Sequence, residues 1–224
     1  METVFNIFLF IHIVSGVLSL TTGSINFVRR KEDLKHKRVG RVFFYSMFTA
    51  GFSSFILSII HPNYFLFTVG VFSVYLVITG LRYLRFKNPD LSAETVDWLI
   101  SGVMLLSSLA MVMMGIRVLL AGNSFGIVFL AFGFAGGLFS ITDFANFRGK
   151  YRSKNFWQLV HLQRMTGAFI ASATAFLVVN TTDLTGVIPS FVAWLLPSAV
   201  LVPMIFIWNK RYAIEKDANE NSDQ

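Results

Sequence analysis

The sequence predicts an all-α, polytopic membrane protein with seven transmembrane helices, and three observations support this prediction. Hydrophobic residues make up 54% of the 224 residues and charged residues only 14%, whereas a soluble domain carries charge on about a quarter of its residues. Apolar runs of about 20 residues recur along the chain, and this length crosses a hydrocarbon core of about 30 Å as a helix. Lys and Arg are almost wholly confined to segments between these runs.

The placement of the basic residues predicts the topology. Seventeen of the nineteen Lys and Arg residues fall into four segments, namely 29–41, 82–87, 148–154 and the tail from Lys210, and the other two are Arg117 and Arg164. Two apolar runs separate each basic segment from the next, so the chain crosses the membrane an even number of times between them. Because loops rich in Lys and Arg stay in the cytoplasm, we expect the N-terminus outside, the C-terminus cytoplasmic and an odd number of crossings.

Hydropathy and helix-breaking residues place the seven spans in order along the chain. The first follows a start that contains Glu2 and no Lys or Arg, the reverse of a secretory signal peptide, so it is predicted to be a retained helix. Short turn-forming segments without Lys or Arg follow the second, fourth and sixth spans. The predicted spans are about 3–27, 42–60, 63–82, 97–118, 123–143, 157–180 and 188–208.

The seven spans form one predicted domain, residues 1–212, and a short tail follows it. Residues 213–224 are polar and largely acidic with no apolar periodicity, so they are predicted to be a disordered cytoplasmic tail. Helices one to three and five to seven are expected to run in the same sense. This order permits a parallel 3+1+3 repeat with helix four as the inverting linker, and a loose match between residues 24–27 and 140–144 is consistent with it.

Composition also limits the chemistry and the partners. The chain contains no Cys, which excludes disulfides, thiolate metal sites, iron–sulfur ligation and a cysteine nucleophile. Its net charge of +7 comes from short flanks beside apolar runs rather than from a folded basic face, so we expect no nucleic-acid partner. The predicted partners are the lipid bilayer and a small-molecule ligand, and the sequence does not indicate an oligomeric state.

The first span carries a stripe of small and polar residues. Its members lie at offsets of 3, 4, 7, 11 and 14 from the first and therefore share one helix face: His12, Ser15, Gly16, Ser19, Gly23 and Asn26. One interpretation is close packing, with polar groups hydrogen-bonded to a neighbouring helix. The other is that His12 lines a cavity as a proton carrier or ligand, because ionisable groups in the apolar layer often mark pathways.

The sixth span has a similar face, and Arg164 is its most informative residue. The face carries Gln158, His161, Arg164, Ala168, Ala171, Ser172 and Ala175. Arg164 lies about 15 Å along the helix from Lys154, and an Arg at the centre of a membrane helix costs about 2.5–3.5 kcal/mol. Either its side chain extends to the cytoplasmic headgroups, or it pairs with an acid inside the bundle. The predicted partner is Asp143, near the cytoplasmic end of the fifth span.

Five residues are candidates for ligand binding or proton relay: His12, His36, Asp143, His161 and Arg164. All except His12 can lie near the inner leaflet. Two His and one carboxylate suit zinc or non-haem iron, so His36, Asp143 and His161 are the metal-ligand candidates, although no pair has metal-ligand spacing and the nearby Arg disfavours a cation. A b-type haem needs two His at similar depth, whereas His12 and His161 are expected at different depths. No catalytic residue is identified, and the cofactor is left open between metal, haem b and none.

Three short elements carry a family resemblance. They are His12 followed by Gly16 and Gly23, His36-Lys37-Arg38-Val39-Gly40-Arg41 at the start of the second helix, and His161 followed by Arg164-Met165 at the start of the sixth. This pattern resembles a family of bacterial predicted membrane proteins classed as a domain of unknown function. The resemblance implies a multi-helix inner-membrane protein and no established activity.

Three functions are compatible with these features. The preferred one is a transporter or small-ligand-binding protein with a polar intramembrane cavity lined by the polar faces of helices one and six. The second is a membrane-embedded enzyme, either a haem or quinone oxidoreductase or a metal-dependent hydrolase. The third is an accessory structural subunit. In each case the predicted location is the cell membrane, as a multi-pass protein of the bacterial inner membrane.

Overall fold

The computed structural model describes residues 1–28, 33–150, 153–181 and 190–214. These residues form an all-α fold with seven long helices, which confirms the predicted fold class. The elements are α1 (Glu2–Val28), α2 (Leu34–Ile60), α3 (Tyr64–Arg82), the 3₁₀ helix η1 (Tyr83–Lys87), α4 (Thr95–Leu120), α5 (Gly126–Phe147), α6 (Phe156–Asn180) and α7 (Ser190–Tyr212). Most of the tail that is predicted to be disordered, residues 215–224, lies outside the described residues.

All seven α-helices are long and apolar enough to cross a membrane. The largest difference from the predicted spans is at α2, which begins at Leu34 rather than near residue 42. The Asp33 side chain accepts a hydrogen bond from the backbone N–H of His36 and so caps the helix. Lys and Arg are good helix formers, so the basic segment continues the helix. With 27 residues, α2 is about 40 Å long and exceeds the hydrocarbon core.

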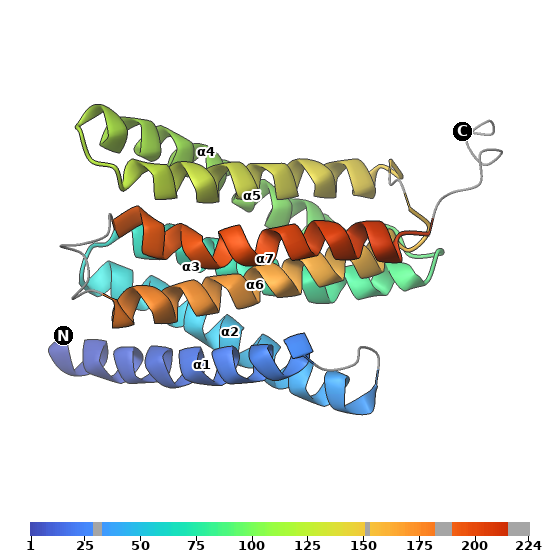
Figure 1. The fold of residues 1–224 in the computed structure, drawn as a ribbon, viewed down its shortest axis with the longest axis horizontal. Helices are drawn as coiled ribbons and strands as arrows, with labels where there is room; N and C mark the ends of the chain where they lie inside the picture. Colours follow the sequence, from blue (N-terminus) through green and yellow to red (C-terminus); the bar gives the residue numbers. More distant parts are fainter. Residues whose placement is uncertain (29–32, 151–152, 182–189, 215–224) are drawn as a thin grey trace.

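The helices form an elongated bundle in which α3 is central (Figure 1). It packs against α2, α4, α5 and α6, while α1 packs along α2 and α5 packs along α4. The core gathers around α3 and includes Phe72, Leu76, Val77, Met104 and Ala168. The polar residues on the core-facing side of α3 are therefore enclosed by the helices packed around it.

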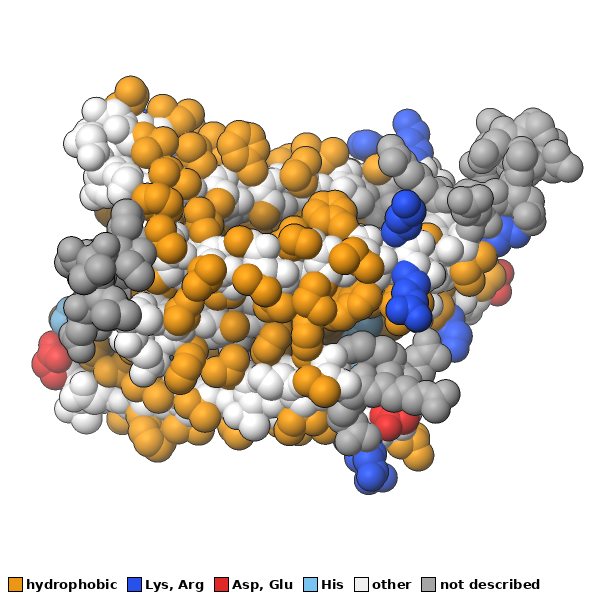
Figure 2. All heavy atoms as spheres, viewed as in Figure 1, with side chains coloured by type: hydrophobic (Ala, Val, Ile, Leu, Met, Phe, Trp, Pro, Cys, Tyr) orange, Lys and Arg blue, Asp and Glu red, His pale blue; other side chains and the backbone are white. Residues whose placement is uncertain are grey.

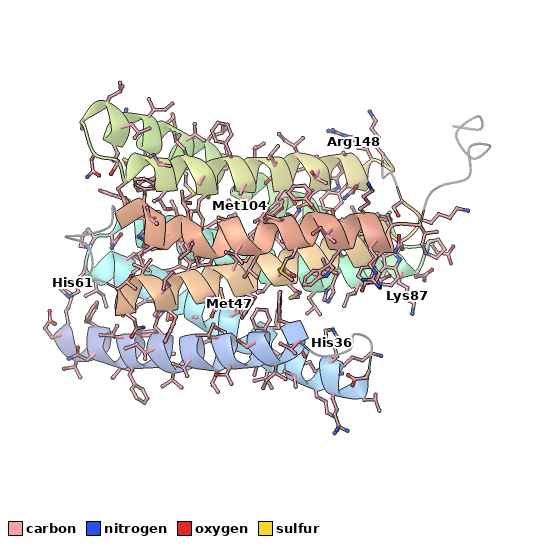
Figure 3. The ribbon with its side chains drawn as sticks, in the orientation of Figure 1. His36, Met47, His61, Lys87, Met104 and Arg148 are labelled. Carbon is pink, nitrogen blue, oxygen red and sulfur yellow. The ribbon has the colours of Figure 1, made fainter. Side chains whose placement is uncertain are left out.

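The Lys and Arg side chains gather at one end of the bundle on the face shown in Figure 2. We call this the basic end; α2, α4 and α6 begin there, and α1, α3, α5 and α7 end there. Figure 3 places His36 and Lys87 at the basic end and His61 at the opposite end. The alternation of helix direction agrees with the arrangement predicted from the basic segments.

Glycine brings α4 and α5 into close contact. A Cβ atom added at Gly126 would lie 2.5 Å from the backbone oxygen of Gly115, and one added at Gly133 would lie 3.0 Å from the backbone oxygen of Ser108. No side chain fits at such distances, so the two helices approach at backbone level. This contact holds Asp143 of α5 against Ser101 of α4.

The helix α7 is attached differently from the others. It packs mainly on α6 and more lightly on α5, and none of its described side chains is fully buried. Its end is tied to the start of α6, because the backbone N–H of Ile214 donates to Asn155 Oδ1 (3.0 Å) and the Ser153 hydroxyl donates to the backbone oxygen of Ile214 (2.8 Å). Pro197 and Pro203 lie inside α7.

The chain directions required by a 3+1+3 repeat are present, but the two halves pack differently. The first helix of one half, α1, packs along α2, whereas its counterpart α5 packs along the linking helix α4. Among the described residues, α5 and α6 share no comparable backbone contact. The repeat stays a prediction from the sequence, and the two halves are not equivalent in their packing.

Candidate functional site

Arg164 of α6 extends into the bundle and pairs with Asp143 of α5. Both residues are 0% exposed, and Nη2 of Arg164 lies 2.7 Å from Oδ1 of Asp143. The same nitrogen donates to the backbone oxygen of Phe139 at 3.1 Å. Of the two placements expected for Arg164, the ion pair with Asp143 is confirmed, and the side chain does not extend to the headgroups.

The Asp143 carboxylate accepts four hydrogen bonds, two on each oxygen. Tyr75 and Ser101 donate to Oδ2, the latter at 2.9 Å, while Tyr83 (2.8 Å) and Arg164 (2.7 Å) donate to Oδ1. A carboxylate offers about four lone-pair sites, so its acceptor capacity is used up. We call these five residues the Asp143 cluster; they come from α3, η1, α4, α5 and α6.

The tyrosines and the serine of the Asp143 cluster are not among the residues predicted from the sequence. Tyr75 and Tyr83 are eight residues apart, which places them on one face of a helix. That spacing was a usable signal, because two hydroxyls on one face of an apolar span need partners there. Ser101 gives no such signal, since hydroxyl groups in membrane helices commonly bond to their own backbone.

The hydrogen-bonding capacity of Arg164 is only partly used. Arginine carries five N–H groups, and the two of Nη2 have acceptors in Phe139 and Asp143. Among the described residues, the buried atoms Nε and Nη1 have no hydrogen-bond partner. The guanidinium carbon lies 4.0 Å from the ring centre of Phe139 and 5.2 Å from that of Tyr75. One edge of the cation is thus neutralised by Asp143, while the other edge is enclosed without an acceptor.

His161 lies one turn before Arg164 and is held against α3. Its Nδ1 is 2.7 Å from the backbone oxygen of Gly80. A carbonyl oxygen only accepts, so Nδ1 carries the proton. Gly80 has no side chain to separate α3 from α6, and a Cβ atom there would lie 2.9 Å from Cβ of Arg164. His161 is therefore a neighbour of the Asp143 cluster through Gly80.

The other two candidate histidines lie elsewhere. His12 is at the α1–α2 interface, where its Nδ1 is 2.9 Å from the backbone oxygen of Ala50 and 3.1 Å from the Ser53 hydroxyl. His36 is in the first turn of α2, and its backbone oxygen accepts from Asn26 Nδ2 at 3.3 Å. Of the five predicted site residues, the structure brings together Asp143, His161 and Arg164.

The polar faces of α1 and α6 contact each other directly. Ser19 and Ser172 are both buried, and their hydroxyl oxygens are 2.9 Å apart. At this level the two faces are packed together rather than separated by the predicted cavity, because hydroxyl pairs of this kind allow membrane helices to approach closely. A groove of about 310 Å³ lies between α1 and α2, and its lining is mostly apolar, with Phe10, Val14 and Tyr45 beside Ser15 of the polar face.

The metal-ligand candidates do not form a metal-binding group. Within the described part of the chain, no set of three or more His, Asp or Glu side chains is placed to hold a metal ion. His36 is near the start of α2, and Asp143 already accepts from four donors. The two intramembrane histidines, His12 and His161, contact different helix pairs.

A second group of charged side chains lies at the basic end, where α3 and η1 meet the start of α4. Arg82 pairs with Asp97 through Nε and with Glu94 through Nη2 at 2.9 Å, and Arg85 also pairs with Glu94. Glu94 and Asp97 form the capping box of α4. We call these four residues the Arg82 cluster. Hydrogen bonds from Arg85 and Arg82 lower the pKa of the exposed Glu94 carboxyl.

Comparisons with protein-family models, with curated proteins and with solved structures gave no match to this chain. The family resemblance therefore stays a prediction. The geometry of the Asp143 cluster is therefore the main indication of function.

Proposed function

We propose that this integral membrane protein binds a small ligand at the buried side chain of Arg164, as a transporter or a ligand-binding protein does. The observation that supports the proposal is that Nε and Nη1 of a fully enclosed guanidinium have no acceptor among the described residues. A buried donor without a partner costs about 1–3 kcal/mol, and more when it is charged. A ligand oxygen at this edge would remove that cost.

The surrounding cluster supports a functional rather than a structural role for the pair. Replacing a buried ion pair by apolar side chains is often neutral or stabilising, so stability alone does not account for Arg164 and Asp143. Every lone pair of Asp143 is used, while three N–H groups of Arg164 are left over. A pair that served only packing would be expected to satisfy both partners. Ionisable residues inside membrane helices commonly mark ligand or ion pathways.

The arrangement of α7 offers a route to the site from the membrane. In Figure 1, α7 is drawn between α5 and α6, the helices that carry Asp143 and Arg164, and it packs on both of them. Its two internal prolines remove helix hydrogen bonds and weaken its continuity. We propose that displacement of α7 exposes the Arg164 edge to a ligand dissolved in the bilayer.

The orientation belongs to the same proposal. The basic end faces the cytoplasm in a bacterial inner membrane, with the N-terminus outside. Trp98 and Trp157 are at this end, in cation–π contact with Arg148 (5.5 Å) and Lys87 (5.9 Å), as expected for residues in a headgroup layer. Because the chain has no Cys, single cysteines at Lys35→Cys and Asn123→Cys can each be tested with a membrane-impermeant thiol reagent added outside, and we expect labelling at position 123 but not at position 35. Labelling of position 35 but not of position 123 would show that the protein has the opposite orientation.

Ligand binding can be tested before the ligand is known. Wild type, Arg164→Lys and the control Arg82→Lys are purified in lipid nanodiscs, and their organic extracts are compared by mass spectrometry. Lys keeps the charge opposite Asp143 but lacks the Nε and Nη1 edge. We expect a compound retained by wild type and Arg82→Lys and lost from Arg164→Lys. Identical extracts from three monodisperse proteins would contradict the proposal and favour the accessory-subunit alternative.

A further inference from the structure

The free edge of Arg164 also restricts the chemistry of what can bind there. We infer that the ligand is an uncharged, lipid-soluble molecule that presents a carbonyl-type oxygen on a flat apolar body. This inference rests on the ligand site proposed above and adds the class of ligand. It follows from three properties of the site: its hydrogen-bonding polarity, its net charge and the side chains around it.

The site offers hydrogen-bond donors, so the ligand must be a hydrogen-bond acceptor. Asp143 has no lone pair left for a ligand donor, because Tyr75, Tyr83, Ser101 and Arg164 use all four positions. Within the cluster, the atoms without a partner among the described residues are Nε and Nη1 of Arg164, and a guanidinium can only donate. Amines and other cationic or purely donating ligands therefore find no partner in the Asp143 cluster.

The net charge favours an uncharged ligand over an anion. The positive charge of Arg164 is already balanced by Asp143 at 2.7 Å, and the other members of the cluster contribute only hydroxyl groups. A carboxylate or phosphate bound at the free edge would add a negative charge without a counter-charge from the cluster. In a buried site that desolvation cost is large. A neutral carbonyl oxygen accepts the same hydrogen bonds without this cost.

The surroundings favour a flat apolar body. The guanidinium lies against the rings of Phe139 and Tyr75, and Phe72 continues this aromatic surface by stacking on Phe139 with ring centres 6.4 Å apart. Aromatic rings pack well against other planar groups. An uncharged molecule of this kind also dissolves in the hydrocarbon core, from which the displacement of α7 proposed above would admit it.

The inference is tested with three probes of similar shape. They are 2-acetylnaphthalene, which has a neutral carbonyl, 2-naphthoate, which is an anion, and 2-ethylnaphthalene, which has no acceptor. Binding to wild type, Arg164→Lys and the control Arg82→Lys in nanodiscs is measured by equilibrium dialysis, corrected for partition into empty nanodiscs. We expect wild type and Arg82→Lys to bind the acetyl probe roughly 10- to 100-fold more tightly than the ethyl probe, the range for one hydrogen bond to a charged group. In Arg164→Lys this preference is lost.

A second measurement locates the probe in wild type and needs no variant. Benzophenone is a neutral ketone, and on irradiation it inserts into nearby C–H bonds. We expect labelled peptides around Phe139 and Met165, reduced by excess 2-acetylnaphthalene. Labelling confined to the outer surface of α1 and α2 would overturn the inference.

The remaining outcomes separate the inference from the proposed function. Tightest binding of 2-naphthoate, lost in Arg164→Lys, overturns the uncharged class while the ligand site at Arg164 stands. Equal binding of all three probes by wild type also overturns the inference, and the extracted-compound experiment then decides the proposed function independently. If Arg164→Lys keeps the preference for the acetyl probe, the carbonyl oxygen does not bind to Nε and Nη1 of Arg164, and the inference is overturned.

Discussion

The Asp143 cluster and the Arg82 cluster both join Arg to Asp, but they differ in their access to water. In the first, Arg164 and Asp143 are 0% exposed and the ion pair is enclosed by helices. In the second, Arg82 is 24% and Glu94 54% exposed in their side chains, and only Asp97 is nearly buried. Water and salt weaken the interactions of exposed charges much more than those of enclosed ones.

The difference in exposure corresponds to different roles of the two Arg–Asp pairs. The Arg82 cluster caps α4 and joins it to the end of α3, and both of its arginines pair with Glu94, which is exposed. The Asp143 cluster joins more helices, and it leaves buried N–H groups of Arg164 without an acceptor among the described residues. We expect the enclosed cluster to dominate both stability and binding when single residues are changed, and the exposed one to contribute little.

The largest effect is expected for Asp143→Asn. This change leaves Arg164 charged and buried without its counter-charge, and removing one partner of a buried pair costs about 3–5 kcal/mol. The free energy of unfolding, measured by SDS titration in mixed micelles, is expected to fall by this amount. A loss no greater than that of Arg82→Gln would remove the distinction between the two clusters.

A smaller net effect is expected when both charges are removed. The double variant Arg164→Gln/Asp143→Asn has no buried charge and keeps amide groups for hydrogen bonding. Because the two residues are in contact, their effects are not additive, and the double variant is expected to be more stable than Asp143→Asn by about 1–3 kcal/mol. The same titration measures this difference. Strict additivity would show that the charges do not act as a pair.

Loss of one hydroxyl should have an intermediate effect. Tyr83→Phe removes a donor to Asp143 and the acceptor for Asn146 Nδ2 at 3.1 Å. A hydrogen bond to a charged group contributes about 1.5–3 kcal/mol, and the unfolding free energy is expected to fall within this range. The matched control is Tyr45→Phe, because Tyr45 is exposed on α2. Equal stability of the two variants would argue against a tight Asp143 cluster.

The smallest effect is expected for Glu94→Gln. The pKa of Glu94 is lowered from 4.5 by Arg85 and Arg82, so its contribution to stability is present above pH 4.5 and is lost as the pH falls through the lowered value. Wild type and variant should differ slightly at neutral pH and converge in acid or in about 1 M salt. Unfolding midpoints across pH measure this. A difference that grows on acidification would reverse the expected sign.

The sequence was sufficient for the fold and for one contact in the site. Apolar length and basic segments determine the helices because lipid leaves the backbone little choice, and a membrane-embedded Arg with few acids available pointed to Asp143. The boundaries of α2 were less predictable, since hydropathy marks the apolar layer whereas the helix starts at its cap, Asp33. Hydropathy alone could not identify Tyr75, Tyr83 and Ser101.

The contact between helices one and six could not be predicted for a related reason. Helical periodicity shows that a face is polar and small, but it does not show which neighbour fills it. In the structure, Ser19 and Ser172 of these two faces are hydrogen-bonded to each other. The surplus N–H groups of Arg164 could not be read from the sequence at all, because they depend on where every neighbouring acceptor lies.

The bonds from Ile214 to Ser153 and Asn155 fix one end of α7 beside the start of α6. At the opposite end of the helix, the ring of Trp194 packs against the rings of Phe65 and Phe125, with ring centres 4.8 and 5.9 Å apart. Because both ends are attached, a displacement of α7 of the kind proposed above would bend the helix between them, where Pro197 and Pro203 interrupt its hydrogen bonds.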